Sequence, residues 1–343
     1  MAAQRPDRAP VMHDVARLAG VSHQTVSRVL NDHPHVREET RRRVEEAIAT
    51  LGYRPNAAAR TLVTSRTRTL GVVAAGTTLF GPASTMLAIE QAARSHGYSV
   101  TVASLPDLST EAVSEAFGYL ESLRVAGVVV IAPQRTAADA MLELPADLPV
   151  VAVDGGLDAD LPIVCVDQAE GARLMTEHLL ALGHRTVHHV AGPADWLEAE
   201  ERVVGWRQML EAAGRPVPEV VRGDWSARSG YERGRALAAD PDVTAVFTAN
   251  DQVALGVLRA LEEAGRRVPG DVSVGGFDDV PEAEFYGPGL TSVRQGFGDV
   301  GERSIATLLS LLEGRAVELG RVPSRTVAPR LVRRRSTAPP PPR

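Results

Sequence analysis

The sequence predicts an all-α helix-turn-helix head followed by an α/β body of two Rossmann-like subdomains. Three observations lead to this fold class. The chain has 343 residues, a length that suits two to three domains of about 150 residues each. Apolar residues recur at helical spacing near the start of the chain, and from residue 69 short apolar runs alternate with longer helical patterns. A hydrophobic content of 44% with 23% charged residues excludes wholesale disorder.

The head, over residues 11–53, is expected to contain three short helices. Gly20 ends the first helix, because glycine readily adopts the left-handed conformation found after a helix. Ser22 follows as the N-cap of the second helix, and a third helix in REETRRRVEEAIATLGY ends at Gly52. Two short helices joined by Gly-Val-Ser are typical of a helix-turn-helix.

The second helix carries polar side chains away from its apolar face, namely His23, Gln24, Ser27 and Arg28. Glutamine can form two hydrogen bonds to adenine and arginine can form two to guanine, so this face suits the DNA major groove. The alternative is a small three-helix core whose polar face contacts only water.

Charge is distributed unevenly along the chain, whose net charge is −6. Residues 1–70 carry +5, residues 71–330 carry −15 and residues 331–343 carry +4. A basic head favours a polyanionic partner, whereas an acidic body repels one.

Apolar runs in the body predict two sets of buried strands with helices between them. The strands are expected at TLGVVAA, YSVTVAS, GVVVIA, PVVAVD, IVCVD, TVHHVAG, AVFTAN and VSVGGF, and the helices near residues 84–96, 109–123, 169–182, 199–213, 227–239 and 251–264. Continuous Val and Ile runs separated by helices are typical of parallel sheets covered on both faces. Two such sets predict two subdomains, with a ligand cleft at the carboxyl ends of the strands.

Polar residues follow several of these strands, and Gln295 follows a further strand end at TSVR, in the positions that border such a cleft. They are Asp154, Asn250, Asp251, Asp278, Asp279 and Gln295, and Arg202 lies in the helical segment EAEERVVGWRQML. Strand-end residues of this type can instead cap the next helix, and we expect Asp251 to do so. Several converging carboxylates and amides with an arginine favour a ligand rich in hydroxyl groups.

Other chemistry is not indicated. The sequence contains no GxxxxGK[ST] loop, no GxGxxG after a strand and no GxSxG, so we expect neither an enzyme nor a bound cofactor. The single cysteine, Cys165, excludes a disulfide framework and is expected to be a buried apolar group. His184, His188 and His189 fall across a turn-to-strand junction and do not share one face, so no metal site is expected.

No run reaches about 18 apolar residues, and the N-terminus lacks the apolar core of a secretory signal. A cytoplasmic protein without a membrane span is therefore expected.

The segment PNAAARTLVTSRTRTL joins the head to the body. Asn56 can cap a helix of about two turns, which is too short to be stable in isolation and would need a surface to hold it. The alternative is an ordinary flexible linker.

The strings VARLAGVSHQTVSRVLN and VREETRRRVEEAIATLGYRPNAAARTL resemble the start of the LacI/GalR family of bacterial transcription regulators, and the resemblance extends over the rest of the chain. It implies a periplasmic-binding-protein-like body that is crossed by three linkers. It also implies DNA contacts by one group of residues in the head, namely Ser22, His23, Gln24, Thr25, Ser27, Arg28, Asn31 and His35.

In the family, a hinge helix orders on DNA beside its dimer mate, and its leucine opens the minor groove. Asn56, Ala59 and Leu62 occupy this helix here, with Leu62 as the wedge. The resemblance further implies effector contacts by a second group of residues in the body, namely Asp154, Arg202, Trp225, Asn250, Asp278 and Gln295. The segment LFGPAS resembles a loop that lines the family's cleft.

These inferences divide the chain into four parts: residues 1–55 as the DNA-binding head, 56–69 as hinge helix and linker, 70–330 as the effector-binding body and 331–343 as a disordered tail. The tail lacks the leucine heptads by which family members tetramerise, so a homodimer on a palindromic operator in double-stranded DNA is expected.

The expected function is a repressor that is released when a saccharide, such as a β-linked disaccharide or glycoside, binds the cleft. The alternative within the family is a co-repressor mode that responds to a non-sugar metabolite or a phosphocarrier protein. A transport-type solute-binding protein and a sugar-converting α/β enzyme are the alternatives from other classes. The helix-turn-helix argues against the first of these, and the missing catalytic motifs argue against the second.

Overall fold

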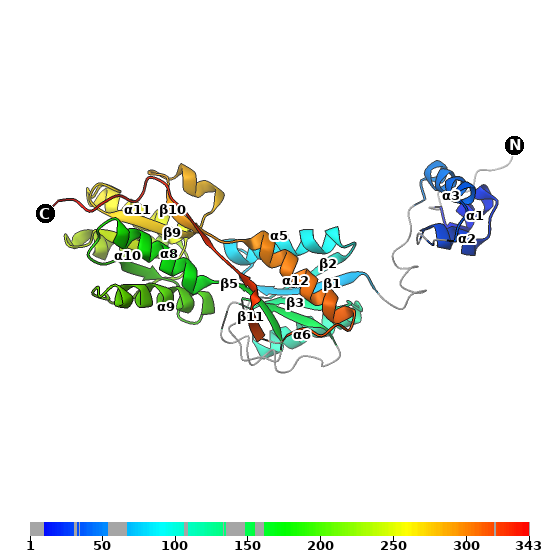
Figure 1. The fold of residues 1–343 in the computed structure, drawn as a ribbon, viewed down its shortest axis with the longest axis horizontal. Coiled ribbons are helices and arrows are strands. Elements are labelled where there is room, and N and C mark those ends of the chain that lie inside the picture. Colours follow the sequence, from blue (N-terminus) through cyan, green and yellow to red (C-terminus); the bar gives the residue numbers. More distant parts are fainter. Residues whose placement is uncertain are drawn as a thin grey trace. The chain divides into compact units, whose positions relative to one another are not determined.

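The structure is a computed structural model that describes residues 10–30, 33, 35–53, 67–105, 109–132, 134, 148–154, 161–318 and 320–342, without the side chains of 321–324. The chain forms two compact units, Met1–Thr67 and Arg68–Arg343, and each is described by itself (Figure 1).

The head consists of the three helices that the sequence predicts. They are α1 (Met12–Ala19), α2 (His23–Leu30) and α3 (Glu38–Leu51). Gly20 ends α1 at a φ of 65°, and the Thr25 N–H donates to the Ser22 hydroxyl at 3.1 Å, so Ser22 caps α2 as expected. The helices enclose a small apolar core built from Val15, Ala16, Ala19, Val26, Val29, Val44, Ala47 and Tyr53.

The first subdomain of the body is a parallel sheet in the strand order β11-β5-β4-β3-β1-β2. Its strands are β1 (Thr69–Ala75), β2 (Ser99–Leu105), β3 (Val128–Ile131), β4 (Val150–Val153), β5 (Pro162–Val166) and β11 (Gly320–Val327). One face is covered by α6 (Thr110–Ser122), and the other by α5 (Phe80–Ser95) and α12 (Phe297–Leu312). The near-continuous burial of the Val-rich strands follows from this cover on both faces.

The second subdomain has the strand order β12-β10-β9-β8-β6-β7, with only β12 antiparallel to its neighbour among the described pairs. Its strands are β6 (His188–Ala191), β7 (Val221–Arg222), β8 (Ala245–Thr248), β9 (Ser273–Asp278), β10 (Thr291–Arg294) and β12 (Arg330–Val332). One face packs on α8 (Gln168–Ala181) and α9 (Leu197–Ala212), and the other on α10 (Ala227–Ala239) and α11 (Asp251–Glu263). A short 3-10 helix, η1 (Pro281–Phe285), follows β9.

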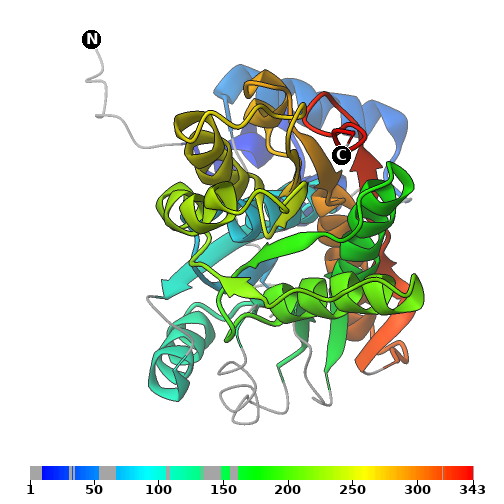
Figure 2. The ribbon, with the colours of Figure 1, turned by 90° about the vertical axis from the view of Figure 1, so that its left-hand side faces the viewer.

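The chain passes between the subdomains three times, after β5, after β10 and after β11. The three crossings that the resemblance implied are therefore present. Figure 2, in which the second subdomain faces the viewer, shows the two sheets lying one behind the other.

The sequence patterns did not predict α12 or the strands β7, β11 and β12. Their prediction of a disordered tail over 331–343 is wrong for residues 331–342, which run along the second subdomain. Ser336 explains this order, because its hydroxyl donates to the Val274 carbonyl at 2.6 Å and accepts from the Thr291 N–H at 2.8 Å. A tail rich in Pro and Arg is thus held by hydrogen bonds to the two neighbouring strands β9 and β10.

The helices of the described part of the chain include none with the length and apolar character needed to cross a membrane.

Candidate functional site

A cavity lies between the subdomains, at the carboxyl ends of the parallel strands. It measures about 310 Å³, including the part open to solvent. Two parts of the chain supply its lining: the segment that opens α5, with Leu79, Phe80, Gly81 and Pro82, and the second subdomain, with Trp196, Glu198, Arg202, Trp225, Asn250, Asp278 and Gln295. Only about 20 Å³ of this space has room for a water molecule, so the lining side chains nearly fill the cleft in this structure.

Arg202 forms the centre of the polar lining. It projects from α9 with only 2% of its surface exposed. Its Nε donates to the Gln168 side-chain oxygen at 2.9 Å, and its Nη1 donates to the Ala249 carbonyl at 2.5 Å. Its guanidinium lies 3.9 Å from the centre of the Phe277 ring, so the charge is held by both hydrogen bonds and a cation–π contact.

A closed chain of side chains links Arg202 to Asp278. Gln168 donates to the Gln295 side-chain oxygen at 2.9 Å, and Gln295 donates to the Asp278 carboxylate at 2.7 Å. Asp278 in turn lies 3.9 Å from the Arg202 guanidinium. Burial raises the pKa of Asp278 to about 6, even though Arg202 and Gln295 both favour its charged form.

Asn250 has two roles, because it caps α11 and also lines the cavity. Its side-chain oxygen accepts from the Val253 N–H at 2.8 Å, and its amide group donates to the Trp225 carbonyl at 3.1 Å. The prediction that Asp251 caps this helix is wrong. Asp251 is fully buried, and its carboxylate accepts from the Ser292 hydroxyl at 2.6 Å.

Two tryptophans form the apolar side of the cavity. The rings of Trp196 and Trp225 meet edge to face at 5.4 Å, and both side chains are buried. The Trp225 Nε1 group finds no hydrogen-bond partner among the described residues, so a buried donor is left unsatisfied at a cavity wall.

The backbone is strained around the same cavity. Asp154, Trp225 and Asp278 have φ values of 62°, 72° and 100°, a region that residues other than glycine adopt at a cost of about 1–3 kcal/mol. Asp154 follows β4, and the carboxyl group of Glu198, which lines the cavity, is near enough to contribute to raising the pKa of Asp154. Burial is the main cause that raises the pKa of both carboxyl groups, and it raises that of Glu198 to about 7.

The structure brings together five of the six effector residues implied by the resemblance: Arg202, Trp225, Asn250, Asp278 and Gln295 all line the cavity, and Asp154 borders it through Glu198. Asp279, the remaining strand-end candidate, turns away from it. Asp279 instead pairs with Arg294 and with Arg334 of the tail.

Sequence reasoning missed Gln168, Trp196 and Glu198. All three lie at or beside the N-terminus of a helix: Gln168 begins α8, Trp196 is the N-cap of α9 and Glu198 is in the first turn of α9. Those helices begin where the cleft is, so a search of helix starts as well as strand ends would have found them.

The head presents a second candidate site on α2. His23, Gln24 and Arg28 are exposed, while Thr25 and Ser27 are partly buried. Among the other implied DNA contacts, Ser22 and His35 are exposed, whereas Asn31, Asn56, Ala59 and Leu62 lie outside the described residues. The exposed face of α2 thus has the side chains that base recognition requires.

No group of three or more His, Cys, Asp or Glu side chains in the described ranges is arranged to hold a metal ion. Cys165 is buried in the core of the first subdomain.

Comparison with known families gives matches to both units. The family described as bacterial regulatory proteins, lacI family, matches residues 11–56, and the periplasmic binding protein-like domain matches residues 176–337.

Comparison with individual proteins gives matches along most of the chain. It is 37% identical over 310 residues to the lactose operon repressor of Escherichia coli (strain K12), which covers 90% of this chain and 86% of that protein. It is also 37% identical over 325 residues to the HTH-type transcriptional regulator CelR of Thermobifida fusca, with coverage of 91% and 94%.

Solved structures agree with these relatives. The lac repressor dimer bound to operator and the anti-inducer ONPF superposes with a TM-score of 0.84 at 34% identity, covering 96% of this chain and 100% of that one. The complex of the regulator CelR with cellobiose gives a TM-score of 0.70 at 34% identity, with coverage of 95% and 99%.

Proposed function

The chain belongs to the LacI family of bacterial regulatory proteins, and we propose that it is a repressor released from a palindromic operator when a saccharide occupies its cleft. The observation that carries the effector part of the proposal is the cavity between the subdomains, where Arg202, Asp278 and Gln295 face two tryptophans.

The chemistry of this cavity suits a sugar. Pyranose rings have hydroxyl groups that both donate and accept hydrogen bonds, and apolar C–H faces that pack on aromatic rings. Asp278 and Gln295 provide acceptors and donors, Arg202 provides a fork of donors, and Trp196 and Trp225 provide the aromatic surface. The complex of the related CelR with cellobiose supports a β-linked disaccharide as the first candidate.

The DNA side of the proposal rests on α2. Its exposed residues His23, Gln24 and Arg28 would contact base edges in the major groove, and Ser22, Thr25, Ser27, Asn31 and His35 would contact the backbone. The hinge helix, with Asn56, Ala59 and Leu62, would order only on DNA, and Leu62 would enter the central minor-groove step.

A dimer would place two such heads on the two halves of a palindrome. Large apolar side chains on one side of the body support it: Leu87 of α5 is 56% exposed, Leu255 of α11 is 44% exposed and Phe285 of η1 is 80% exposed. These three elements lie along the same side of the body in Figures 1 and 2. The related lac repressor forms a dimer on its operator.

Regulation would follow from the position of the cavity between two subdomains. A sugar that binds one arrangement of the subdomains better than the other shifts their equilibrium, and a shift at the dimer interface would separate the hinge helices. The coupling expected for such a device is about 1–3 kcal/mol per site.

The test is operator binding measured by fluorescence anisotropy with a panel of neutral saccharides that begins with cellobiose. A fall in operator affinity with one of them would support induction. A rise in affinity with any ligand would establish the co-repressor mode instead, and operator binding that no saccharide alters would refute a sugar effector.

A further inference from the structure

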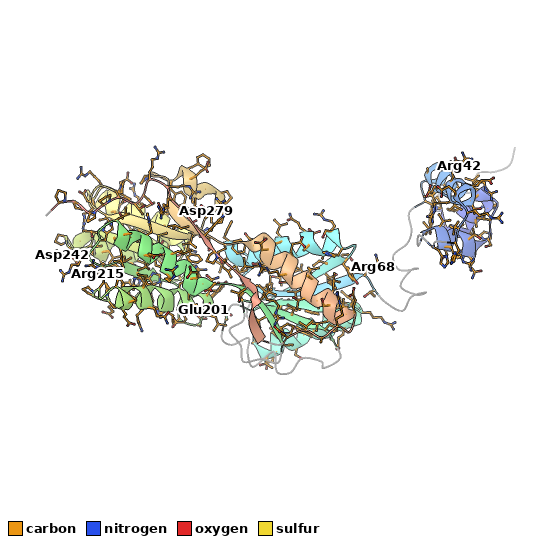
Figure 3. All side chains as sticks on the ribbon, in the orientation of Figure 1. Arg42, Arg68, Glu201, Arg215, Asp242 and Asp279 are labelled. Carbon is orange, nitrogen blue, oxygen red and sulfur yellow. The ribbon has the colours of Figure 1, made fainter. Side chains whose placement is uncertain are left out.

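A buried carboxylate that does not line the cavity joins two separate parts of the chain. The side chain of Asp279 is only 1% exposed. One of its carboxylate oxygens accepts from Nε of Arg294, which ends β10, and the other accepts from Nη1 of Arg334 in the tail at 2.6 Å. Figure 3 shows Asp279 at the end of the second subdomain that faces the first.

These ion pairs are next to the pair of side chains that lines the cavity. Asp278 and Arg294 lie opposite each other on the parallel strands β9 and β10. Gln295, the next residue along the chain, donates to the Asp278 carboxylate at 2.7 Å, and both line the cavity. Each strand therefore ends in one residue of the cavity and one residue of the ion pair. The Asp279–Arg294 pair thus fixes how the two strand ends, and with them Asp278 and Gln295, lie relative to each other.

The backbone needs to be held at this point. Asp278 and Asp279 have φ values of 100° and 55°, in the left-handed region that favours glycine. Residues in such conformations persist only where the surrounding structure over-determines them. The Asp279 N–H donates to the Ser292 hydroxyl at 3.1 Å, and the ion pairs of Asp279 add to this bond. The direction of the Asp278 side chain therefore depends on how Asp279 is held.

The tail acts on this turn through one nitrogen atom. Nη1 of Arg334 donates both to Asp279 and, at 2.8 Å, to the Leu290 carbonyl just before β10. The Arg334 N–H donates to the Thr291 hydroxyl at 2.9 Å. Arg334 thus connects the end of β9 to the start of β10, although it follows the last crossing between the subdomains.

We propose that Asp279 and Arg334 are positioning residues of the effector site, which hold Asp278 and Gln295 in the arrangement that a saccharide meets. The tail then takes part in effector recognition although Arg334 is not part of the cavity lining. This inference rests on the proposed function, because it adds a support to the same cleft. Loss of the support should reduce saccharide affinity by at least about tenfold, the effect of losing one hydrogen bond to a charged group.

The experiment is isothermal titration calorimetry of the full-length protein with cellobiose, at a temperature where unfolding curves show every variant to be folded. Arg334→Gln removes the charge and should weaken binding by at least about tenfold. Arg334→Lys should restore most of the affinity, because one ammonium group can make both contacts of Nη1. The matched control is Arg335→Gln, which removes the same charge from an exposed neighbouring position and should leave the affinity unchanged.

A structural role would give a different result. A residue that only stabilises the fold lowers the midpoint of unfolding and leaves the cellobiose affinity of the folded protein unchanged, and this outcome would overturn the inference. Operator affinity without cellobiose, measured by fluorescence anisotropy, should be the same for Arg334→Gln and the unmodified protein.

A second measurement needs no saccharide. Burial raises the pKa of Asp278 to about 6, and the hydrogen bond from Gln295 lowers it. Arg334→Gln should weaken that bond and so raise the pKa, as followed by carbon NMR titration with Asp278→Asn to assign the resonance. In a Gln295→Ala background, Arg334→Gln should have little further effect. An equal rise in both backgrounds would mean that the lost charge acts directly on Asp278, and it would overturn the positioning role.

The outcomes separate the two proposals. If folded Arg334→Gln binds cellobiose as tightly as the unmodified protein, the positioning role is wrong and a sugar-responsive regulator still stands. If the unmodified protein binds neither cellobiose nor any other neutral saccharide, the sugar effector is wrong, and the titration of Asp278 still decides the positioning role.

Discussion

Replacing Arg202 with alanine is expected to destabilise the body strongly, and more so at pH 8 than at pH 5. The substitution removes the donors to Gln168 and to the Ala249 carbonyl, and it leaves Asp278 buried without its nearest cation. Removing one partner of a buried ion pair typically lowers the free energy of unfolding by about 3–5 kcal/mol, and we expect that loss at pH 8.

The pH dependence follows from Asp278. Burial raises its pKa to about 6, above the unfolded value of 3.8, so its contribution to stability is fully present below pH 3.8 and declines as the pH rises through 6. The positive charge of Arg202 lowers the pKa of Asp278, so Arg202→Ala should raise that pKa further. The fall in stability that accompanies ionisation of Asp278 then continues to a higher pH. At pH 5 most of Asp278 is protonated in both proteins, so the loss of stability should be smaller there by about 1–2 kcal/mol.

The assay is urea unfolding at the two pH values, followed by tryptophan fluorescence. All three tryptophans are buried in the body, so the signal reports on this unit and not on the head. Arg202→Ala in an Asp278→Asn background provides the control, because the pH-dependent part of the loss should disappear there. Equal losses at both pH values and in both backgrounds would refute the coupling between Arg202 and Asp278.

Three further results are expected. Gly205→Ala should destabilise the body by several kcal/mol in urea unfolding, because a Cβ at this position would lie 2.0 Å from the Ala169 carbonyl oxygen. Gly118→Ala is the control, since this helix position is exposed and has open space, and it should stabilise the body by about 0.5–1 kcal/mol. Equal effects of the two substitutions would contradict the close packing of α8 on α9. Leu62→Ala should weaken binding to a palindromic operator far more than binding to random DNA in gel-shift titrations, and equal losses would exclude the wedge role. Operator affinity should fall by about 10³-fold or more between 50 and 200 mM salt, and a flat profile would exclude phosphate contacts by the basic head.

Much of the fold was predictable because it depends on local patterns. Apolar residues at helical spacing predicted the head, and Val-rich runs predicted the strands of both sheets. The cleft residues Asn250, Asp278 and Gln295 were predictable for the same reason, since the carboxyl ends of parallel strands converge at one edge.

The remainder depends on contacts that no local pattern encodes. The carboxyl groups of Asp154 and Glu198 lie near each other only because two subdomains face each other, and the two residues are far apart in the sequence. The order of the tail depends on Ser336, whose hydroxyl bonds to two neighbouring strands, although the Pro and Arg content predicted disorder. The sequence pattern predicted Asp251 as the N-cap of α11, but the preceding residue, Asn250, caps this helix by accepting from the Val253 N–H.

Operator affinity with the cleft empty and filled is the most direct measurement of the central claim. With a saturating saccharide, the dissociation constant of the unmodified protein for its operator should rise by at least about tenfold, as expected for a coupling of 1–3 kcal/mol per site in a dimer. With Arg202→Ala, the same saccharide should leave the dissociation constant unchanged. If calorimetry shows that a saccharide occupies the cleft while the dissociation constant for the operator stays the same, the cleft does not control DNA binding.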